Sequence, residues 1–269
     1  MRSDLVPEGL WERVAPLLPP APERRRRHPG RLRVPDRTAL AGIMYVLRTG
    51  VAWRDAPGET VGCSGVTAWR RLRDWTEAGV WPRLHAALLT ELRRADLLDL
   101  GDCAVDGSHV RALEGGDHVG PSPVDRARPG SKHHLIVDRQ GIPLTVALTG
   151  GNRHDVTQLL PLLDAIPPIR GLRGRPRRKP RRLYADQGYD FDKYRRLLWK
   201  RAIKPVIARW GVPHGSGLGK VRWVVERSFA WLHQFKRLSI RYERRADLHQ
   251  GLLELACSII CLRKLRLQT

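Results

Sequence analysis

The chain has 269 residues and a formal net charge of +22, from 49 lysines and arginines against 27 acidic residues. That length fits one large domain or a small domain followed by a medium one, and so strong a positive charge indicates a polyanionic partner, most commonly nucleic acid. Arginine outnumbers lysine 41 to 8, which either favours bidentate contacts to phosphate and guanine or reflects a GC-rich genome.

Cysteine spacing argues against a zinc protein, and hydropathy argues against a secreted or membrane-spanning one. The four cysteines show no paired CxxC spacing, so they are typical of core residues in a reducing compartment and argue against a zinc site. The N-terminus has no signal-peptide pattern, and no apolar run approaches the ~20 residues of a membrane span. We therefore expect a cytoplasmic protein without a membrane partner.

Amphipathic helical patterns fill residues 1–98. Helices are expected over 7–18, 36–49, 64–79 and 81–98, with Asp36 as the cap of the second and Gly50 as its end. The third helix is expected to turn Val66, Trp69, Leu72 and Trp75 inward and to present Arg70, Arg71 and Arg73 outward. This arrangement fits a helix-turn-helix that enters a DNA major groove, although any helical hairpin with a basic outer face has the same pattern.

Two arginine-rich segments are candidates for DNA contacts. The run at 24–27 is either a solvated arm or a contact to the DNA backbone or minor groove. The segment 167–182 carries eight basic residues between Arg170 and Arg182. It forms either a flexible solvated loop or, as we favour, a strap that follows DNA. Its DNA-contacting candidates are Arg175, Arg177, Arg178 and Lys179.

The periodicity changes at 99–101, which predicts a boundary between domains 1–98 and 99–269. Strands are expected over 103–110, 132–137 and 142–148, and the turn at 139–141 makes these three a meander. A helix that follows the possible cap at 152–155 ends near 165. The remaining expected elements are strands at 182–185 and 204–207 and helices at 192–200, 218–238 and 248–265.

The helix at 218–238 places Glu226 among basic, apolar and aromatic residues. Arg222 precedes this carboxylate by one turn, and Lys236 and Arg237 follow it, so the surroundings suit phosphate. Taken alone, Glu226 is more typical of a solvated residue paired with Arg222 at i, i+4. Two further acids change that interpretation, because Asp106 lies within the first strand and Asp186 directly follows the fourth.

Three carboxylates displayed by an α/β core suit two Mg²⁺ ions, with Mn²⁺ as an alternative. Mg²⁺ binds through few carboxylates together with water and substrate phosphate. Paired ions about 3.5 to 4 Å apart activate the attacking oxygen and stabilise the leaving oxygen in a displacement at phosphorus. The sequence therefore predicts catalytic and metal-binding roles for Asp106, Asp186 and Glu226.

Several motifs resemble those of DDE transposases encoded by bacterial insertion sequences, in particular the family usually called insertion sequence five. They are VDGSHVRA, GSKHHLIVD with GIPL behind it, LTGGNRHD, YADQGYD and WVVERSFAWLHQFKRLSIRYER, together with LLPP, MYVLRTGVAWRD and DWTEAGVW nearer the N-terminus. The resemblance spans nearly the whole chain, and the order of the motifs is highly specific. It implies an α/β fold, α+β overall, in which an all-helical domain precedes an RNase H-like mixed sheet flanked by helices.

The resemblance also implies roles for single residues. The family triad carries over onto Asp106, Asp186 and Glu226. In related transposases the helix signature has a Tyr, an Arg, the catalytic Glu and a Lys in series. Arg222 matches the Arg, whereas Gly219 stands at the Tyr position and His233 at the Lys position, so Lys236 or Arg237 is expected to substitute at the terminal phosphate. Three further residues are candidates for orienting the triad without binding the metal themselves: His154, Asp155 and His233. The segment 152–155 also fits an ordinary helix cap.

The implied function is transposition of the element that encodes the chain. Such a transposase binds the terminal inverted repeats, hydrolyses the end phosphodiester to free a 3′-hydroxyl, and joins that hydroxyl to target DNA. A homodimer on double-stranded DNA is expected, in a bacterial cytoplasm and associated with the nucleoid. Two alternatives stay open at this point: a DNA-binding protein without catalysis, and an RNase H-like nuclease without strand transfer.

Overall fold

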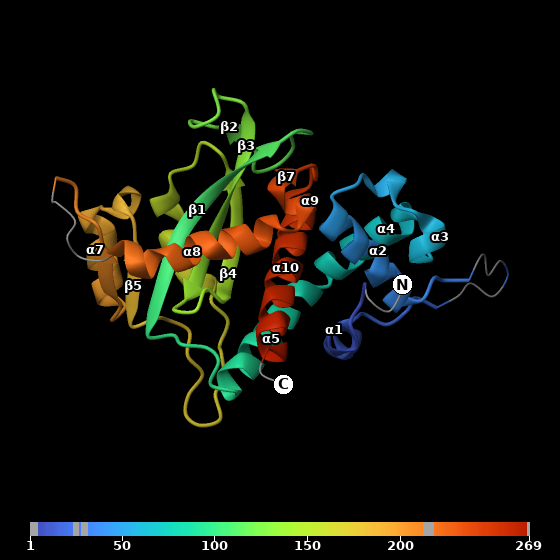
Figure 1. The fold of residues 1–269 in the computed structure, drawn as a ribbon, viewed down its shortest axis with the longest axis horizontal. Coiled ribbons are helices and arrows are strands. Elements are labelled where there is room, and N and C mark those ends of the chain that lie inside the picture. The colour runs from blue at the N-terminus through green and yellow to red at the C-terminus, as the bar shows by residue number, and fades with distance from the viewer. Residues whose placement is uncertain (1–4, 24–26, 28–31, 212–217, 268–269) are drawn as a thin grey trace.

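A mixed β-sheet carries the acidic residues singled out above (Figure 1). The computed structural model describes residues 5–23, 27, 32–211 and 218–267, so most of the arginine run 24–27 and of the loop before 218 lies outside the described residues. The strands are β1 (Asp102–Ala112), β2 (Gly120–Pro121), β3 (Pro129–Asp138), β4 (Pro143–Gly150), β5 (Arg182–Ala185), β6 (Lys204–Ile207) and β7 (Ile240–Arg241).

The strand order of the main sheet is β4-β3-β1-β5-β6, and the short β2 and β7 add to β3 and β1. β1, β3 and β4 pair antiparallel, which confirms the expected meander, whereas β5 and β6 continue the sheet parallel to β1. This order and these directions are those of an RNase H-like sheet, as expected. β5 pairs with β1 only as far as Ala104, so the chain leaves the sheet beside the middle of β1.

Helices dominate the N-terminal part of the chain. They are α1 (Glu8–Val14), η1 (Ala15–Leu17), α2 (Asp36–Thr49), η2 (Trp53–Asp55), α3 (Gly58–Val61), α4 (Gly65–Glu77) and α5 (Val80–Arg94). Ser64 caps α4 by accepting a hydrogen bond from the Thr67 amide, and Gly50 ends α2 at a φ of 75°. The expected cap at Asp36 is wrong, because α2 starts after Pro35 and the Asp36 side chain pairs with Arg33 and Arg71.

The expected pair of helices differs in its connection and in one residue. α2 and α4 pack together, but η2 and α3 lie between them, and a turn at 62–64 joins α3 rather than α2 to α4. Val66 was expected to face inward and is instead 51 % exposed at the start of α4. The residues buried there are Gly65 and Ala68, because the start of α4 packs against η2 and α2.

The C-terminal part supplies η3 (Asp155–Gln158), α6 (Leu159–Ala165), η4 (Gln187–Tyr189), α7 (Asp192–Lys200), α8 (Leu218–His233), α9 (Lys236–Ser239) and α10 (Ala246–Arg266). The single helix expected over 218–238 is therefore wrong. The chain breaks after His233 because Phe235 leaves the helical conformation and is buried, together with Leu238.

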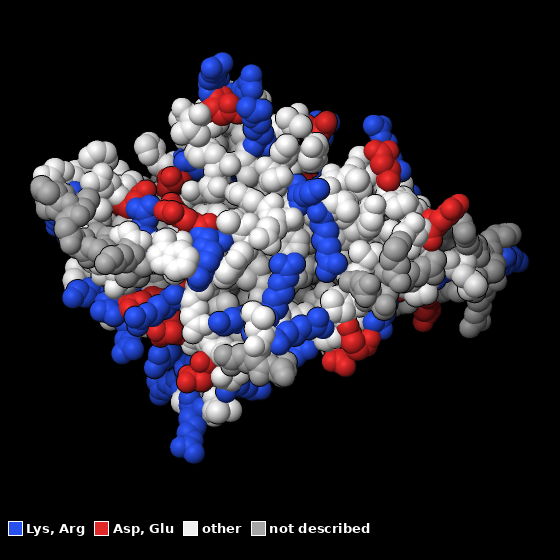
Figure 2. Space-filling model, viewed as in Figure 1, with Lys and Arg blue, Asp and Glu red and all other residues white. Residues whose placement is uncertain are grey.

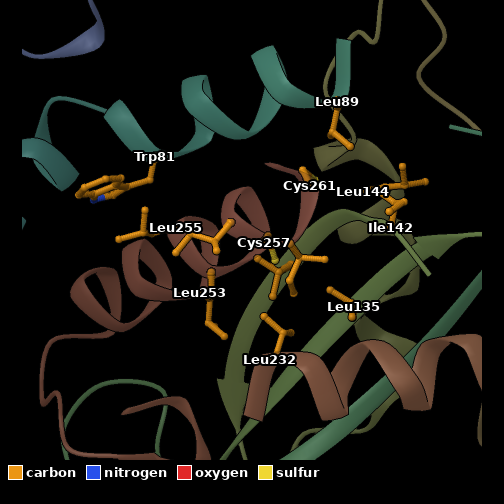
Figure 3. Packing of buried hydrophobic residues seen from close by; sticks show 14 of the residues in the cluster. Trp81, Leu89, Leu135, Ile142, Leu144, Leu232, Leu253, Leu255, Cys257 and Cys261 are labelled. Carbon is orange, nitrogen blue, oxygen red and sulfur yellow. The ribbon is translucent and has the colours of Figure 1, made fainter. Parts of the chain in front are cut away.

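One apolar cluster connects the helical part with the sheet. α10 lies between α5 and the sheet, with Trp81 and Leu89 on one side and Leu135 and Ile142 on the other (Figure 3). The four cysteines are free and buried, as expected of core residues. The domain boundary near 99 stays a prediction. None of the described helices is both long enough and apolar enough to span a membrane.

Candidate active site

Asp106 lies in the middle of β1 with its side chain 19 % exposed, and it accepts a hydrogen bond from the Gly107 amide at 2.8 Å. Its pKa is raised from 3.8 to about 6, with burial as the largest cause. The charges of Asp186 and Asp155 contribute to this rise, whereas the Gly107 amide and Arg222 oppose it. The first predicted acid is therefore a desolvated carboxylate with two other carboxylates close by.

Asp186 directly follows β5, the strand parallel to β1. Its Oδ1 accepts the Gly188 amide at 2.9 Å, which caps η4 and fixes the side chain at the end of the strand. Because β5 ends next to the middle of β1, the Asp186 charge reaches Asp106 and raises its pKa. The sheet thus brings the first two predicted acids to one site.

Glu226 comes to the same site from α8, which crosses β1 in Figure 1. Its side chain is 62 % exposed, and Arg222 joins it to the sheet: the Arg222 Nη2 lies 3.3 Å from Glu226 Oε1 and 3.9 Å from Asp106 Oδ2. Figure 2 shows acidic side chains gathered beside the α7 end of α8, with basic side chains next to them and across the same face.

The donors at this site fit a divalent cation in their chemistry. Within the described residues, no three Asp, Glu, His or Cys side chains are spaced to hold an ion in this conformation. The carboxylates of Asp106, Asp186 and Glu226 are nevertheless the hard oxygen ligands that Mg²⁺ prefers. Burial is the largest cause of the raised pKa of Asp106, and Arg222 is the one cation among the causes that lower it.

The predicted DNA-contacting residues of α4 divide into exposed and paired side chains. Arg70 is exposed, and Arg73 is half-exposed beside Asp74 and over the Trp69 ring. Arg71 was expected to point outward, but its side chain is 13 % exposed and pairs with Asp36 at 3.1 Å. The expected outward orientation of Arg71 is therefore wrong, because this guanidinium joins α4 to α2. Its contact to DNA stays a prediction.

The two basic residues after α8 also differ from each other. Lys236 is exposed on α9. Arg237 was expected near a phosphate, but its side chain is 5 % exposed and binds Glu243 Oε1 at 2.8 Å. It also donates hydrogen bonds to the carbonyl oxygens of Gly50 and Val51 at the end of α2. Arg237 therefore helps to hold α9 against the end of α2, and its expected contact to a phosphate stays a prediction.

The basic segment 167–182 projects from the fold beyond the end of α5 (Figure 1). A bridge between Ile169 and Arg177 closes the loop, and the Lys179 Nζ donates to the Arg201 carbonyl at 2.6 Å. The loop is thus tied at both ends. The predicted contacts Arg175, Arg177, Arg178 and Lys179 are all exposed.

The three residues expected to support the triad lie in different surroundings. His154 is exposed before η3 and makes no side-chain capping hydrogen bond. The His233 ring lies beside those of Phe229 and His133, and burial lowers its pKa. Asp155 alone of the three is among the charges that raise the pKa of Asp106.

Sequence reasoning missed two residues at this site. The Lys132 side chain is 7 % exposed and pairs with Asp155 at 3.0 Å, and the only signal for it was a lysine within a strand of otherwise buried pattern. Tyr189, three residues after Asp186, is buried, and its pKa lies well above its usual value because of burial and the neighbouring carboxylates. The motif YADQGYD contains it, but spacing alone did not separate it from core aromatics.

Comparison with known proteins assigns the chain to a class of enzyme. Residues 99–261 match the family described as "Transposase DDE domain", and residues 6–85 match "Putative transposase of IS4/5 family (DUF4096)". The chain therefore belongs to the DDE transposases of bacterial insertion sequences. As such it is an enzyme of DNA transposition, a polynucleotidyl transferase with endonuclease chemistry.

Individual relatives carry corresponding names. The chain is 63 % identical over 148 residues to "Putative transposase for insertion sequence element IS402" of Burkholderia cepacia, a match covering 55 % of this chain and 70 % of that protein. It is 31 % identical over 139 residues to "Putative transposase for insertion sequence element IS6501" of Brucella ovis, covering 49 % and 98 %. Among solved structures, the Mos1 mariner paired end complex with Mn is a distant likeness, with 11 % identity, 89 % and 82 % coverage and a TM-score of 0.32.

Proposed function

We propose that Asp106, Asp186 and Glu226 are the catalytic and metal-binding triad of this transposase. They hydrolyse the phosphodiester at each end of the element to free a 3′-hydroxyl and then support the attack of that hydroxyl on target DNA. The observation that carries the proposal is the position of Arg222, whose guanidinium lies within 4.0 Å of both Asp106 and Glu226 although these acids come from different elements.

The residues of the site have separable tasks in this proposal. Bound between the three carboxylates, two Mg²⁺ or Mn²⁺ ions would activate the attacking oxygen and stabilise the leaving one. Arg222 holds the acids together without substrate, and its side chain is close enough to pair with the scissile phosphate when DNA enters. Gly107 and Gly188 orient the Asp106 and Asp186 carboxylates through hydrogen bonds from their amides.

DNA binding is assigned to the exposed members of the predicted set. At the start of α4, Val66 and Arg70 are free to meet base edges and phosphates in a major groove, with Arg73 beside them. Lys236, exposed on α9, takes the place of Arg237 in this set. The loop residues Arg175, Arg177, Arg178 and Lys179 supply further phosphate contacts. A homodimer on the terminal inverted repeats, within the nucleoid, follows because two ends are joined in one event.

The decisive experiment is a strand-transfer assay with a pre-cleaved element end, target DNA and Mg²⁺. Glu226→Gln keeps the size of the side chain and removes its charge, and we expect joining to fall on the order of 10²–10³-fold, the size of losing one group that stabilises transition-state charge. Asp164→Asn is the matched control, because Asp164 is an exposed acid on α6 paired with Arg201. It should join like the parent.

The outcomes separate the open alternatives. Equal joining by the parent and Glu226→Gln would contradict the assigned triad. Specific binding to the repeats without cleavage or joining by any variant indicates a DNA-binding protein only. Cleavage of ends without joining of a pre-cleaved end indicates a nuclease that lacks strand transfer.

A further inference from the structure

A second group of charged residues lies behind Asp106, on the opposite face of β1. Successive residues of a strand point to opposite faces, so Gly107 faces away from Asp106 and α8. A Cβ atom at Gly107 would lie 2.8 Å from Asp155 Oδ1 and 3.3 Å from His134 Nδ1. The Asp155 carboxylate therefore rests against the backbone of β1, and only the absence of a side chain at Gly107 permits this approach.

Asp155 is held in that place by buried partners on β3. The Lys132 Nζ lies 3.0 Å from Asp155 Oδ1 and donates to the Arg153 carbonyl at 2.8 Å. His134 Nδ1 lies 3.7 Å from the same carboxylate oxygen, and its Nε2 is hydrogen-bonded to Thr149 at 2.7 Å. Lysine is rarely buried without a partner, so the position of Lys132 depends on Asp155 as much as the reverse.

The segment that begins at Asp155 also lies beside the segment that follows Asp186. η3, which begins at Asp155, packs against η4, which follows Asp186. Tyr189, the last residue of η4, is buried, and its hydroxyl has no hydrogen-bond partner within the described part of the chain. The charges of Asp106, Asp155 and Asp186 all raise the pKa of this phenol, so it stays protonated and can act only as a donor among carboxylates.

We propose that Asp155, fixed by Lys132 against Gly107, is a fourth acid of the catalytic centre and a positioning residue for it. From the face of β1 opposite Asp106, the Asp155 carboxylate adds negative charge near Asp106 and Tyr189 and orients these two side chains. The inference rests on the proposed function, because it assigns Asp155 to the same cation-binding centre. The competing explanation is structural: the ion pair merely ties η3 to β3.

Mn²⁺ binding to the full-length protein without DNA separates these explanations, with the free ion measured by electron paramagnetic resonance. Loss of a partner that orients a metal ligand typically costs 10- to 100-fold in metal affinity, so Asp155→Asn should weaken Mn²⁺ binding by about that factor. Asp164→Asn, an exposed acid on the neighbouring helix, should leave the affinity unchanged. Thermal melting of each variant establishes that it is folded.

Gly107→Ala tests the geometry without touching an acid. The added methyl group meets Asp155 Oδ1 at 2.8 Å and must displace it. We expect Mn²⁺ affinity to fall as in Asp155→Asn, and the double variant to be no weaker than the worse single variant, because both changes act on one carboxylate.

Parental affinity in folded Asp155→Asn, together with weakened binding in Asp106→Asn, would overturn this inference and leave the proposed triad intact. Parental affinity in Asp106→Asn would overturn the proposed triad, and this inference with it.

Discussion

Asp106 and Asp138 are buried aspartates on neighbouring strands, and burial raises the pKa of each to about 6. A carboxyl whose pKa is raised in the folded state contributes stability below its unfolded pKa, near 3.8, and this contribution is lost as the pH rises through 6. Ionised Asp106 therefore opposes folding at pH 7 in the metal-free protein. We expect Asp106→Asn to raise the free energy of unfolding by up to about 3 kcal/mol at pH 7.

Urea unfolding at pH 7 and pH 4 checks this expectation. The gain should nearly vanish at pH 4, where the parental carboxyl is mostly protonated in the folded state. A variant that is less stable than the parent at pH 7 would show that Asp106 makes favourable contacts outweighing its desolvation. The predicted combination of higher stability and lost strand transfer is the usual signature of a strained functional group.

Asp138 should respond in the opposite direction despite its similar pKa. Its two oxygens accept hydrogen bonds from the amides of Gln140 at 2.9 Å, Ile142 at 2.7 Å and Asp99 at 3.1 Å. Asparagine offers one acceptor oxygen, so Asp138→Asn leaves at least one buried amide unpaired, and we expect a loss of about 1–3 kcal/mol in the same urea titration. Stabilisation by this change would mean that burial alone governs both residues.

At the scale of elements, α9 joins the end of α2 to the catalytic part through Arg237. Arg237→Gln removes one partner of a buried ion pair and leaves Glu243 with His249, at 3.3 Å, as its remaining partner among the described residues. Breaking a buried ion pair costs about 3–5 kcal/mol. A double variant, Arg237→Met with Glu243→Gln, removes both charges and should recover part of that loss. Urea unfolding of the single and double variants measures both the loss and the recovery in the free energy of unfolding. Additive losses would show that the two side chains do not depend on each other.

The elements that the sequence predicts best are those whose pattern is local. β5, α7 and β6 have the predicted bounds, because turn residues and a change of periodicity delimit each of them. The break between α8 and α9 and the burial of Arg71 and Arg237 were not predictable, since Phe235 turns into a core built from other elements and the two arginines take partners elsewhere in the chain.

The residues of the candidate site also divide into those that a local pattern predicts and those that only the fold brings together. The three acids stand on the predicted types of element, and the i, i+4 spacing already placed Arg222 beside Glu226. The contact of Arg222 with Asp106 and the approach of Asp155 to Gly107 join segments that only the folded sheet brings together. A single sequence contains no signal for such pairs.

At the scale of the whole molecule, α10 makes the helical part and the sheet depend on each other. Gly251 marks the closest approach, because a Cβ there would lie 2.7 Å from Thr76 Oγ1 and 2.9 Å from Trp81 Cδ1. Both neighbours are fixed by the hydrogen bond from the Trp81 indole to Thr76 at 2.9 Å. Since one apolar cluster runs through α5, α10 and the sheet, we expect thermal unfolding in a single transition.

Gly251→Ala tests this coupling against helix propensity. Alanine in a helix interior is favoured over glycine by about 1 kcal/mol, but overpacking a fixed contact costs about 1–3 kcal/mol, so the variant should be less stable than the parent. Gly219→Ala in the first turn of α8 is the matched control, because none of the described residues lies within 4 Å of its added Cβ, and it should be as stable as the parent or slightly more so. Calorimetry should show the whole transition of Gly251→Ala moving to lower temperature. Two transitions, of which only one moves, would mean that residues 1–98 and 99–269 unfold independently despite their shared core.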